Sequence, residues 1–448
     1  MTGTKTKLGC LVLGVMILAG RAASSAPGPD VVRCLDVGPV WSGHFVGFCL
    51  LTSPEGQYVA FYDSDRQMTV ARRDLGADVW GFQKLPSRLG WDSHNYVTMA
   101  LDETGCLHVS GNMHGHPLVY FRADEPGDIR SLRAVPAMVG HLERRCTYPK
   151  FFDGSEGELI FTYRDGSSGS GNQIYNTYDA RTLTWRRLLD TPLLDGRGLM
   201  NAYPVGPDRG PDGRYHLCWI WRDTPDCRTN HDVSYARSRD LVNWETAAGQ
   251  PVRLPMTIQT PGLVVDPVPA GGGAINGNTR IGFDSQNRPI VTYHKFDDEG
   301  FTQVYNARYE DDGWRVYQAT DWDYRWYFQG GGTIHFEIRV SPVRTHSDGS
   351  LTQGYHHDRY GSGTWRLRET DLKPVGQIQE RRQWPVSLVQ PESDLPGMQV
   401  NWRGDSGTSG RPGVRYALRW ETLGVHRDRP RDTVPPPSIL KLYELREP

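Results

Sequence analysis

Short apolar or alternating segments recur along the chain, and each follows a polar turn that contains glycine or asparagine. They are Tyr58–Tyr62, Leu107–Ser110, Leu159–Tyr163, Tyr215–Trp221 and Ile290–Tyr293, with a weaker sixth that begins at Leu351. Segments of this length and period, set between turn residues, predict β-strands. The turn residues lie at positions 56, 105, 157, 213, 287 and 349. A period of about 50 residues with several strands per unit is typical of a β-propeller.

The number of repeats and the ends of the chain indicate how such a ring would close. The chain has 448 residues, and roughly 55 residues per unit predicts an all-β, seven-bladed β-propeller. Strands at Gly413–Thr422 and Ile439–Leu445 would form the last blade. A strand near Val31–Val37 would complete that blade, because closure removes the exposed edges of a sheet. We expect one propeller domain over residues 27–448.

Composition supports a protein made of strands and turns. The chain contains 50 Gly, 31 Pro, 14 Trp and 21 Tyr, which with the absence of long helical stripes argues against a helical bundle. The net charge of −2 argues against nucleic acid as a partner, because no basic excess exists to neutralise phosphates. Cations are nevertheless mostly arginine, which suits bidentate binding of carboxylate or sulfate; codon bias is the alternative explanation.

The N-terminal segment has the pattern of a secretory signal peptide. Lys5 and Lys7 precede an apolar run over residues 8–20, and Ser24 and Ala26 supply small residues before a cleavage point. The run is too short for a comfortable transmembrane helix. We expect a signal peptide over residues 1–26 and a secreted or periplasmic, monomeric protein with no membrane association after cleavage. Six cysteines would remain, a number that permits disulfides and equally permits free thiols.

Two histidines stand out among the polar residues that would gather on one face of the ring. His94 lies in Trp91–Asn95 and His114 in Gly111–His116, on either side of one predicted strand. An imidazole titrates near neutral pH, which suits a general base. The alternative is that each is a hydrogen-bonded structural histidine in a loop.

Later blades add guanidinium groups, phenols and amides to the same face. The relevant segments are Cys146–Lys150, Tyr163–Gly169, Asn201–Tyr203, Trp221–Asp223 and Thr229–Asp232. Arginine and asparagine suit the carboxylate of an acidic sugar, and aromatic rings suit its faces. The glycine-rich run after Arg164 fits a loop, and the alternative is a tight turn in which Arg164 pairs with Asp165 on the surface. We assign Asp92, Asp165 and Asp232 to turn capping, so a carboxylate pair for glycoside hydrolysis is not evident.

A structural metal is a separate hypothesis. His216, Cys218, Cys227 and His231 supply ligand types that zinc prefers. Their spacing is loose, and a disulfide or free thiols explain the cysteines equally well. We therefore assign no metal ligand and expect no required cofactor, although a structural zinc or calcium ion is compatible with the chain.

Several of these sequence motifs together resemble those of the BNR-4 repeat proteins. They are Asp92–Asn95 with Asn112–His114, Tyr163–Ser167, Thr229–Asp232 with Tyr235–Ser238, and Gly331–Ile334. The resemblance covers residues 40 to 340, about two thirds of the chain. The family includes propeller-type ulvan lyases, which act on rhamnose–glucuronate linkages. The resemblance implies a seven-bladed propeller and a lyase that acts on an acidic polysaccharide by β-elimination.

The same resemblance implies roles for individual residues. His94 and Tyr148 would serve as base and acid, and Arg164 would neutralise the uronate carboxylate, an electrostatic role expected to contribute most. The predicted substrate-binding residues are Asn95, His114, Tyr203, Arg222, Asn230 and His231. Two other functions stay open: a propeller glycoside hydrolase of the rhamnosidase or sialidase kind, and a glycan-binding propeller without catalysis. A sialidase would need an arginine triad and regular Asp boxes, of which only a degenerate one is visible, at 238–244.

Overall fold

The computed structural model describes residues 28–379, 382–408 and 410–446. Within these ranges the regular structure is β-sheet, interrupted by the 3₁₀ turns η1 (Ile129–Ser131), η2 (Cys227–Thr229) and η3 (Val386–Leu388). The predicted all-β class is therefore confirmed. The predicted signal peptide, residues 1–26, lies outside the described residues.

The first three sheets contain four, four and six strands. The first consists of β2 (Cys49–Thr52), β3 (Gln57–Tyr62), β4 (Gln67–Arg73) and β5 (Gly81–Arg88). The second consists of β6 (Val97–Leu101), β7 (Leu107–Gly111), β9 (Tyr120–Ala123) and β10 (Leu132–Ala134). The third consists of β8 (His114–His116), β11 (Cys146–Asp153), β12 (Leu159–Ser167), β13 (Ser170–Asp179), β14 (Thr184–Arg187) and β15 (Leu194–Asp195).

Four further sheets follow. The fourth consists of β16 (Asn201–Arg209), β17 (Tyr215–Arg222), β18 (Asn230–Ser238), β19 (Trp244–Glu245), β20 (Pro251–Val252) and β21 (Val264–Asp266). The fifth consists of β22 (Arg280–Phe283), β23 (Pro289–Phe296), β24 (Thr302–Glu310) and β25 (Gly313–Gln318). The sixth consists of β26 (Ile338–Val340), β27 (Arg344–Thr345), β28 (Leu351–His357), β29 (Gly361–Leu367) and β30 (Pro374–Ile378). The seventh consists of β31 (Met398–Gly404), β32 (Val414–Leu423), β33 (Ser438–Arg446) and β1 (Asp30–Val40).

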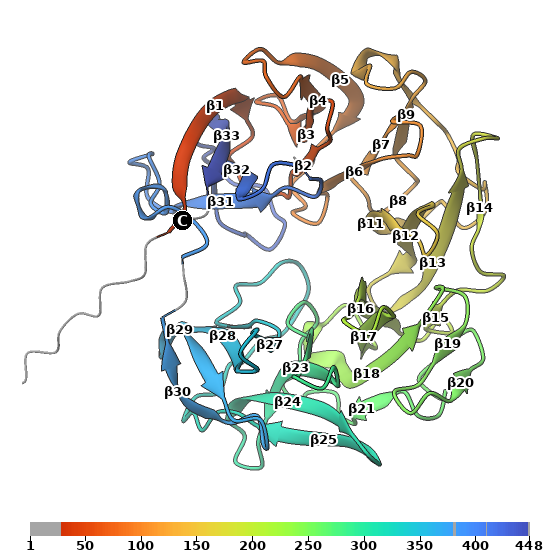
Figure 1. Cartoon of the computed structure of the whole chain (residues 1–448), viewed down its shortest axis with the longest axis vertical. Helices are drawn as coiled ribbons and strands as arrows, with labels where there is room; N and C mark the ends of the chain where they lie inside the picture. Colours follow the sequence, from red (N-terminus) through yellow and green to blue (C-terminus); the bar gives the residue numbers. More distant parts are fainter. Residues whose placement is uncertain (1–27, 380–381, 409, 447–448) are drawn as a thin grey trace, which may run out of the picture.

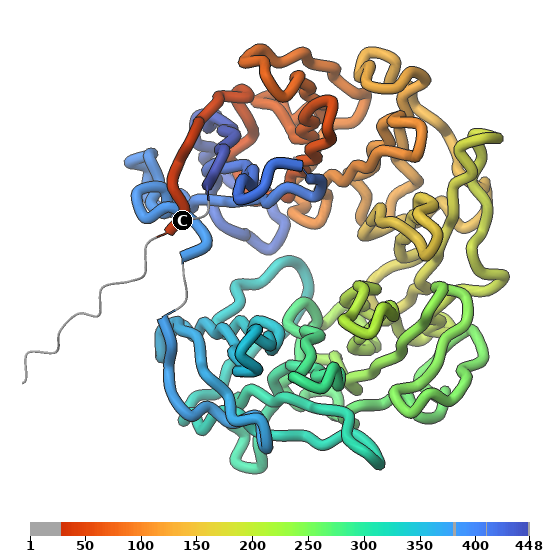
Figure 2. Tube along the Cα trace, in the orientation of Figure 1, coloured from red at the N-terminus to blue at the C-terminus, as the bar shows by residue number. Residues whose placement is uncertain are grey.

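The sheets follow one another around a ring in the order of the sequence (Figure 1). The Cα trace shows the colours running once around this ring from the N-terminal to the C-terminal segment (Figure 2). The propeller-type arrangement is therefore confirmed. The described residues form seven sheets, which is the number that a propeller of seven blades requires.

The last sheet joins both ends of the described chain. Strand β1 pairs antiparallel with β33, from Asp30 opposite Arg446 to Val40 opposite Ser438, and β33 pairs with β32. The predicted closure of the ring by N-terminal and C-terminal strands is thus confirmed. The pairing provides hydrogen-bond partners for the backbone groups along the edge of β33, which would otherwise be exposed and unpaired.

The recurring turns occupy one structural position. In five sheets they join the first long strand to the next, as between β2 and β3 or between β22 and β23, and in the sixth sheet the turn joins the short β27 to β28. A side chain often satisfies the backbone of the turn: Asp284 Oδ1 accepts hydrogen bonds from the amides of Gln286 and Arg288 at 3.0 and 2.9 Å. This local chemistry explains why the repeat is visible in the sequence.

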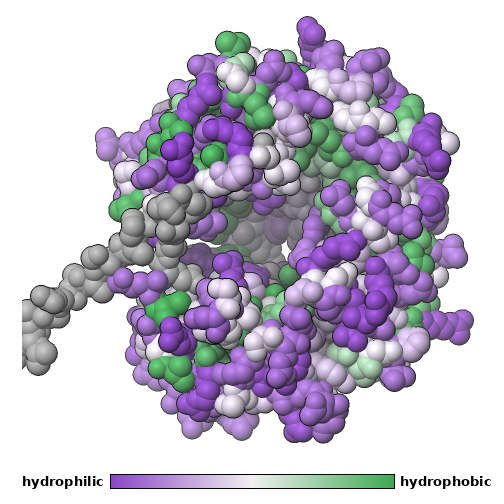
Figure 3. Space-filling model, in the orientation of Figure 1, coloured by the Kyte–Doolittle hydropathy of each residue, from purple (hydrophilic) through white to green (hydrophobic). Residues whose placement is uncertain are grey.

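The core lies between neighbouring sheets. Every residue of β3 and of β17 is buried, because the middle strands of a sheet are covered on both faces by the adjacent sheets. Trp420 of the last sheet, for example, stacks on Phe48 at the start of the first, with ring centroids 4.6 Å apart. The outer surface is mainly hydrophilic and is hollowed at the middle of the ring (Figure 3).

The six cysteines of the described part are all free thiols, and five of them are buried. Burial raises the pKa of Cys146 and of Cys218 to about 12 each, which keeps these thiols protonated. In the same part of the chain, no helix has the length and apolar character needed to cross a membrane.

Candidate active site

Strand pairing brings distant polar segments together at one end of the sheets. Thr147 of β11 lies opposite His114 of β8 on one side and opposite Arg164 of β12 on the other. The Thr147 hydroxyl also accepts a hydrogen bond from the amide of Gly115 at 2.7 Å. A β-bulge follows Thr147, and Tyr148 within it has a φ of 57°. The bulge redirects the Tyr148 side chain toward the loop that carries His94.

A single carboxylate holds both histidines. Asp92 Oδ1 lies 2.7 Å from Nδ1 of His94, and Asp92 Oδ2 lies 2.6 Å from Nδ1 of His114. The two imidazole rings stack with centroids 4.4 Å apart. Because an ionised carboxylate only accepts hydrogen bonds, each Nδ1 carries the proton and each Nε2 is left as an acceptor. Within the described residues neither Nε2 has a hydrogen-bond partner, so both can take a proton from a ligand.

The charge state of Asp92 follows from these contacts. Burial favours the protonated form, but the hydrogen bonds from the two imidazoles outweigh burial and hold the pKa of Asp92 well below its usual range. Asp92 is therefore ionised at neutral pH and stabilises positive charge on either ring. The sequence assigned it to turn capping, and it does accept from the His94 amide at 2.9 Å. Its position two residues before one histidine and 22 before the other was the available signal for the second role.

Two tyrosines extend the cluster. The Tyr148 ring lies 5.9 Å from that of His94, 5.8 Å from that of His114 and 6.2 Å from that of Tyr203. Burial, with the neighbouring phenol of Tyr203, raises the pKa of Tyr148, so its hydroxyl is a proton donor at neutral pH. Burial has the same effect on Tyr203, but the charges of Arg164 and Arg222 outweigh it and lower the pKa of that phenol.

Arg164 is a buried cation without a matching anion. Arg164 is 2% exposed. Its guanidinium carbon lies over the rings of Tyr148 and Tyr203, 5.0 and 5.5 Å from the ring centroids. Nε and Nη1 have no hydrogen-bond partner within the described residues. Leaving such donors unsatisfied is costly, so an anionic ligand beside Arg164 would be favoured.

The alternative interpretation of Arg164 is wrong. A surface ion pair with Asp165 is not formed, because Arg164 is directed inward and burial raises the pKa of Asp165. The tight turn that belonged to this alternative is present, and the glycine-rich run expected to be a loop is mostly strand. Strand β12 continues to Ser167 and β13 begins at Ser170, so only a tight hairpin turn separates them.

A hydrogen-bonded chain leads from Tyr203 to the next sheet. Arg222 Nη1 lies 3.4 Å from the Tyr203 hydroxyl and 3.3 Å from Oδ1 of Asn276. Asn230 donates to the same oxygen of Asn276 at 3.2 Å, and Ser168 lies 2.7 Å from the Tyr203 hydroxyl. Asn276 was missed by the sequence analysis, because an isolated amide in a loop carries no local signal, whereas Ser168 lies in the identified segment Tyr163–Gly169 but was given no role.

Two predicted substrate-binding residues have other contacts. Both ring nitrogens of His231 are engaged, Nε2 by Asp223 at 2.9 Å and Nδ1 by Asp232 at 2.8 Å. Burial opposes protonation of His231, but these carboxylates outweigh it and raise its pKa. Asn95 is 5% exposed, and its backbone carbonyl accepts from the Tyr62 hydroxyl at 2.6 Å. Contact of either residue with substrate stays a prediction, and the contacts present are structural.

A loop from the far end of the chain braces the histidine segment. Asp428 Oδ1 accepts hydrogen bonds from the amide and the hydroxyl of Ser93 at 3.1 and 2.7 Å. Asp428 Oδ2 accepts from the Thr333 amide at 2.8 Å and lies 3.5 Å from Nδ1 of His94. Only closure of the ring brings Asp428 here, since it lies more than 330 positions from Ser93 in sequence.

The four residues considered as possible zinc ligands are not gathered. His216 bonds to the Tyr235 hydroxyl at 2.6 Å and to Asp212 at 2.9 Å. In the described part of the chain, the one compact group of possible metal ligands is Asp92, His94 and His114. Each imidazole Nδ1 is hydrogen-bonded directly to an oxygen of Asp92, which leaves no room for an ion between carboxylate and Nδ1. This group therefore fits an acid–base role better than a metal site.

Sequence comparison identifies the family. The profile described as "BNR repeat-containing family member" matches residues 56–322, more than half of the chain; the chain belongs to this family. An ulvan lyase, short isoform, from Alteromonas sp. (strain LOR) is 27% identical over 133 residues, 27% of this chain and 25% of that protein. An ulvan lyase, long isoform, from Glaciecola sp. (strain KUL10) is 34% identical over 62 residues, 14% of this chain and 6% of that protein. The matches thus span a quarter or less of these relatives.

Solved structures share the fold over nearly the whole chain. The polysaccharide lyase Uly1 superposes with a TM-score of 0.61 at 13% identity, covering 93% of this chain and 99% of that one. A PL25 ulvan lyase superposes with a TM-score of 0.59 at 14% identity, covering 92% and 96%. The same enzyme class bound to -[GlcA(1-4)Rha3S]- gives a TM-score of 0.58 at 13% identity, covering 92% and 96%. At these identities the similarity establishes the propeller-type fold.

Proposed function

We propose that this member of the BNR repeat-containing family is a polysaccharide lyase that cleaves a uronate-containing polymer by β-elimination. The observation that carries the proposal is Arg164, a buried guanidinium with two unsatisfied donors. It lies beside the phenol of Tyr148, whose ring centroid is 5.9 and 5.8 Å from two imidazoles whose Nε2 atoms are free to accept a proton. A uronate carboxylate on Arg164 would place the sugar ring against all three groups.

The reaction follows from the protonation states. Arg164 neutralises the carboxylate, which makes the C5 proton of the uronate acidic. Nε2 of His94 takes that proton, and Asp92 stabilises the resulting imidazolium. The electron pair forms a C4–C5 double bond as the C4–O4 bond breaks. Tyr148, which is protonated at neutral pH, donates its proton to the departing O4. Both proton transfers are thus assigned to groups in the required starting state.

The substrate we propose is of the ulvan type, with glucuronate or iduronate linked to rhamnose. A ligand of this kind occupies the structurally similar PL25 ulvan lyase, and two curated relatives are ulvan lyases. Tyr203, Arg222 and Asn230 would hold neighbouring parts of the polymer. We also propose that the protein is secreted, because its N-terminal segment has the pattern of a signal peptide, and that it acts as a monomer.

A hydrolase is less well supported by the geometry. Hydrolysis of a glycosidic bond normally uses two carboxyl groups on either side of it. The carboxylate of this cluster, Asp92, is engaged by two imidazoles on its two oxygens. It is therefore not available as a nucleophile or as a proton donor.

The test is direct observation of the double bond. The protein is mixed with ulvan, and the ultraviolet absorbance of the conjugated unsaturated uronate is followed with time. A lyase produces this absorbance together with new reducing ends. New reducing ends without absorbance would indicate a hydrolase, and binding without either product would indicate a glycan-binding propeller; both results overturn the proposal.

A further inference from the structure

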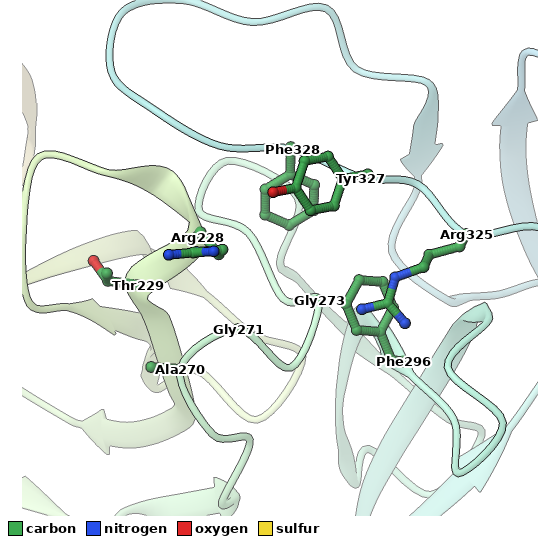
Figure 4. Close-up of a pocket in the computed structure, with 9 residues that line it drawn as sticks. All are labelled: Arg228, Thr229, Ala270, Gly271, Gly273, Phe296, Arg325, Tyr327 and Phe328. Atoms are coloured by element: carbon green, nitrogen blue, oxygen red, sulfur yellow. The ribbon is translucent and has the colours of Figure 1, made fainter.

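A cavity lies beside the turn η2 that precedes β18. It has a volume of about 410 Å³, within the range of small-ligand pockets. Its lining residues are Arg228, Thr229, Ala270, Gly271, Gly273, Phe296, Arg325, Tyr327 and Phe328 (Figure 4). Thr229 directly precedes Asn230 at the start of β18, so the cavity adjoins the outer end of the Tyr203–Arg222–Asn276 chain.

The cavity is positively charged. Figure 4 shows the guanidinium groups of Arg228 and Arg325 on opposite sides, with the Tyr327 and Phe328 rings between them. Arg228 is exposed and makes no side-chain hydrogen bond or ion pair within the described residues. Arg325 donates to the Gly300 carbonyl at 2.8 Å but has no acidic partner in that part of the chain. The lining contains no aspartate or glutamate, so a bound anion would meet two cations without repulsion.

Aromatic rings form much of the remaining wall. Tyr327 is 57% exposed, whereas Phe328 is buried. The Arg325 guanidinium lies 3.8 Å from the centre of the Phe296 ring. Gly273 permits this ring position, because its φ is 87° and a Cβ atom there would lie 2.6 Å from Phe296. Exposed ring faces next to planar guanidinium groups suit a pyranose that carries an oxyanion.

We propose that this cavity is a subsite for an anionic sugar unit of the polymer, outside the Arg164 centre where the linkage is cleaved. The inference rests on the proposed lyase function. It adds a second place on the protein at which a longer substrate gains binding affinity. The anion can be a sulfate ester or a second uronate carboxylate, since both match the fork geometry of arginine. Short oligosaccharides that fill only the Arg164 centre would not reach the cavity.

The experiment uses two independent changes to the cavity. The double variant Arg228→Gln/Arg325→Gln removes the charge, and Ala270→Trp fills the space while both arginines stay. Arg181→Gln is the matched control, because this arginine is 88% exposed and lies at the turn between β13 and β14, away from the cavity. Thermal unfolding of each variant verifies that it is folded.

Affinity is measured by calorimetry on ulvan oligosaccharides of increasing length. We expect the native protein and the control to bind longer chains more tightly. We expect each cavity variant to lose about tenfold or more of that length-dependent affinity, while affinity for the shortest chains changes little. Oligosaccharides that are desulfated, or reduced at their carboxyl groups, show which anion the cavity takes. Unchanged length dependence in both variants would overturn the subsite.

The outcome is separable from that of the lyase proposal. If the native protein shows length-dependent binding that the cavity variants lose, but forms no double bond, then the subsite stands and the lyase function fails. If cleavage occurs and length has no effect on binding, the lyase function stands and the subsite fails. If the native protein binds none of the anionic oligosaccharides, both proposals fail.

Discussion

Replacing Asp92 by asparagine tests the assignment of the histidine pair with little change in volume. The carboxylate accepts a hydrogen bond from Nδ1 of both His94 and His114, at 2.7 and 2.6 Å. An amide has one accepting oxygen and one donating nitrogen. One imidazole therefore keeps its Nδ1 proton, and the other must accept from the amide and carry its proton on Nε2. A ring in that second state cannot act as a base at Nε2.

The size of the effect follows from the role that is lost. A positioned general base typically accelerates the reaction about 10²–10⁴-fold. Asp92→Asn also removes the negative charge that stabilises the imidazolium. We expect kcat on ulvan to fall by about 10²–10⁴-fold with a much smaller change in KM. Initial rates of double-bond formation measure both constants. Nitrogen chemical shifts of the imidazoles report which ring changes its tautomer.

Asp358→Asn is a chemically matched control. Asp358 also lies between two imidazoles, with His335 Nε2 at 2.6 Å and His356 Nε2 at 2.9 Å. It belongs to the more exposed connection after β28, outside the candidate active site. We expect this variant to keep kcat close to that of the native protein. If Asp92→Asn is folded, moves the proton of neutral His94 to Nε2 and still turns over within about threefold of the native rate, the assignment of the base is wrong.

The other predictions concern substrate charge, stability and binding. Arg164→Ala should lower kcat/KM by about 10²–10³-fold, and Arg164→Lys should restore only part of it, because lysine cannot form a two-bond fork; equal activity of native protein and Arg164→Ala would refute this. Burial lowers the pKa of His44 and His294 to about 4 each, so the folded state resists their protonation and stability should fall as the pH drops from about 6.5 toward 4. Protonation of each histidine lowers the free energy of unfolding by up to about 1.4 kcal/mol per pH unit, which denaturant midpoints measure. His44→Phe should make this dependence of stability on pH less steep. Because the pKa of His231 is raised in the folded state, the stability it adds is present at acidic pH and is lost as the pH rises through its pKa; His231→Gln should lower Tm more at pH 6 than at pH 9. Arg222→Ala should mainly raise KM, since Arg222 touches Tyr203 and Asn276 rather than the proton-transfer groups; a pure kcat effect would contradict its placement.

Much of the fold could be read from local sequence. The turn that joins the first two strands of a sheet needs a side-chain acceptor and a glycine or asparagine, as at Asp284–Asn287, so it repeats with the sheets. The apolar runs of β3 and β17 are visible because both of their faces are buried. The pairing of β1 with β33 was predictable because an open ring would leave an exposed edge.

The candidate site was only partly predictable, and the reason is physical. His94, His114, Tyr148 and Arg164 were identified by residue type and by resemblance to a family. Whether they face one another depends on strand register, the bulge after Thr147 and the packing of adjacent sheets.

The sequence by itself determined the β-strand repeats, the turn chemistry and the residue types available for acid–base chemistry, because these depend on contacts between near neighbours. Only the tertiary structure decided that Asp92 bonds both histidines, that Arg164 is buried without an anion and that Asp428 braces the histidine loop. It also decided that His231 is engaged by two carboxylates and that the possible zinc ligands are not gathered. These features depend on distances between residues tens to hundreds of positions apart, and those distances exist only once the ring has closed.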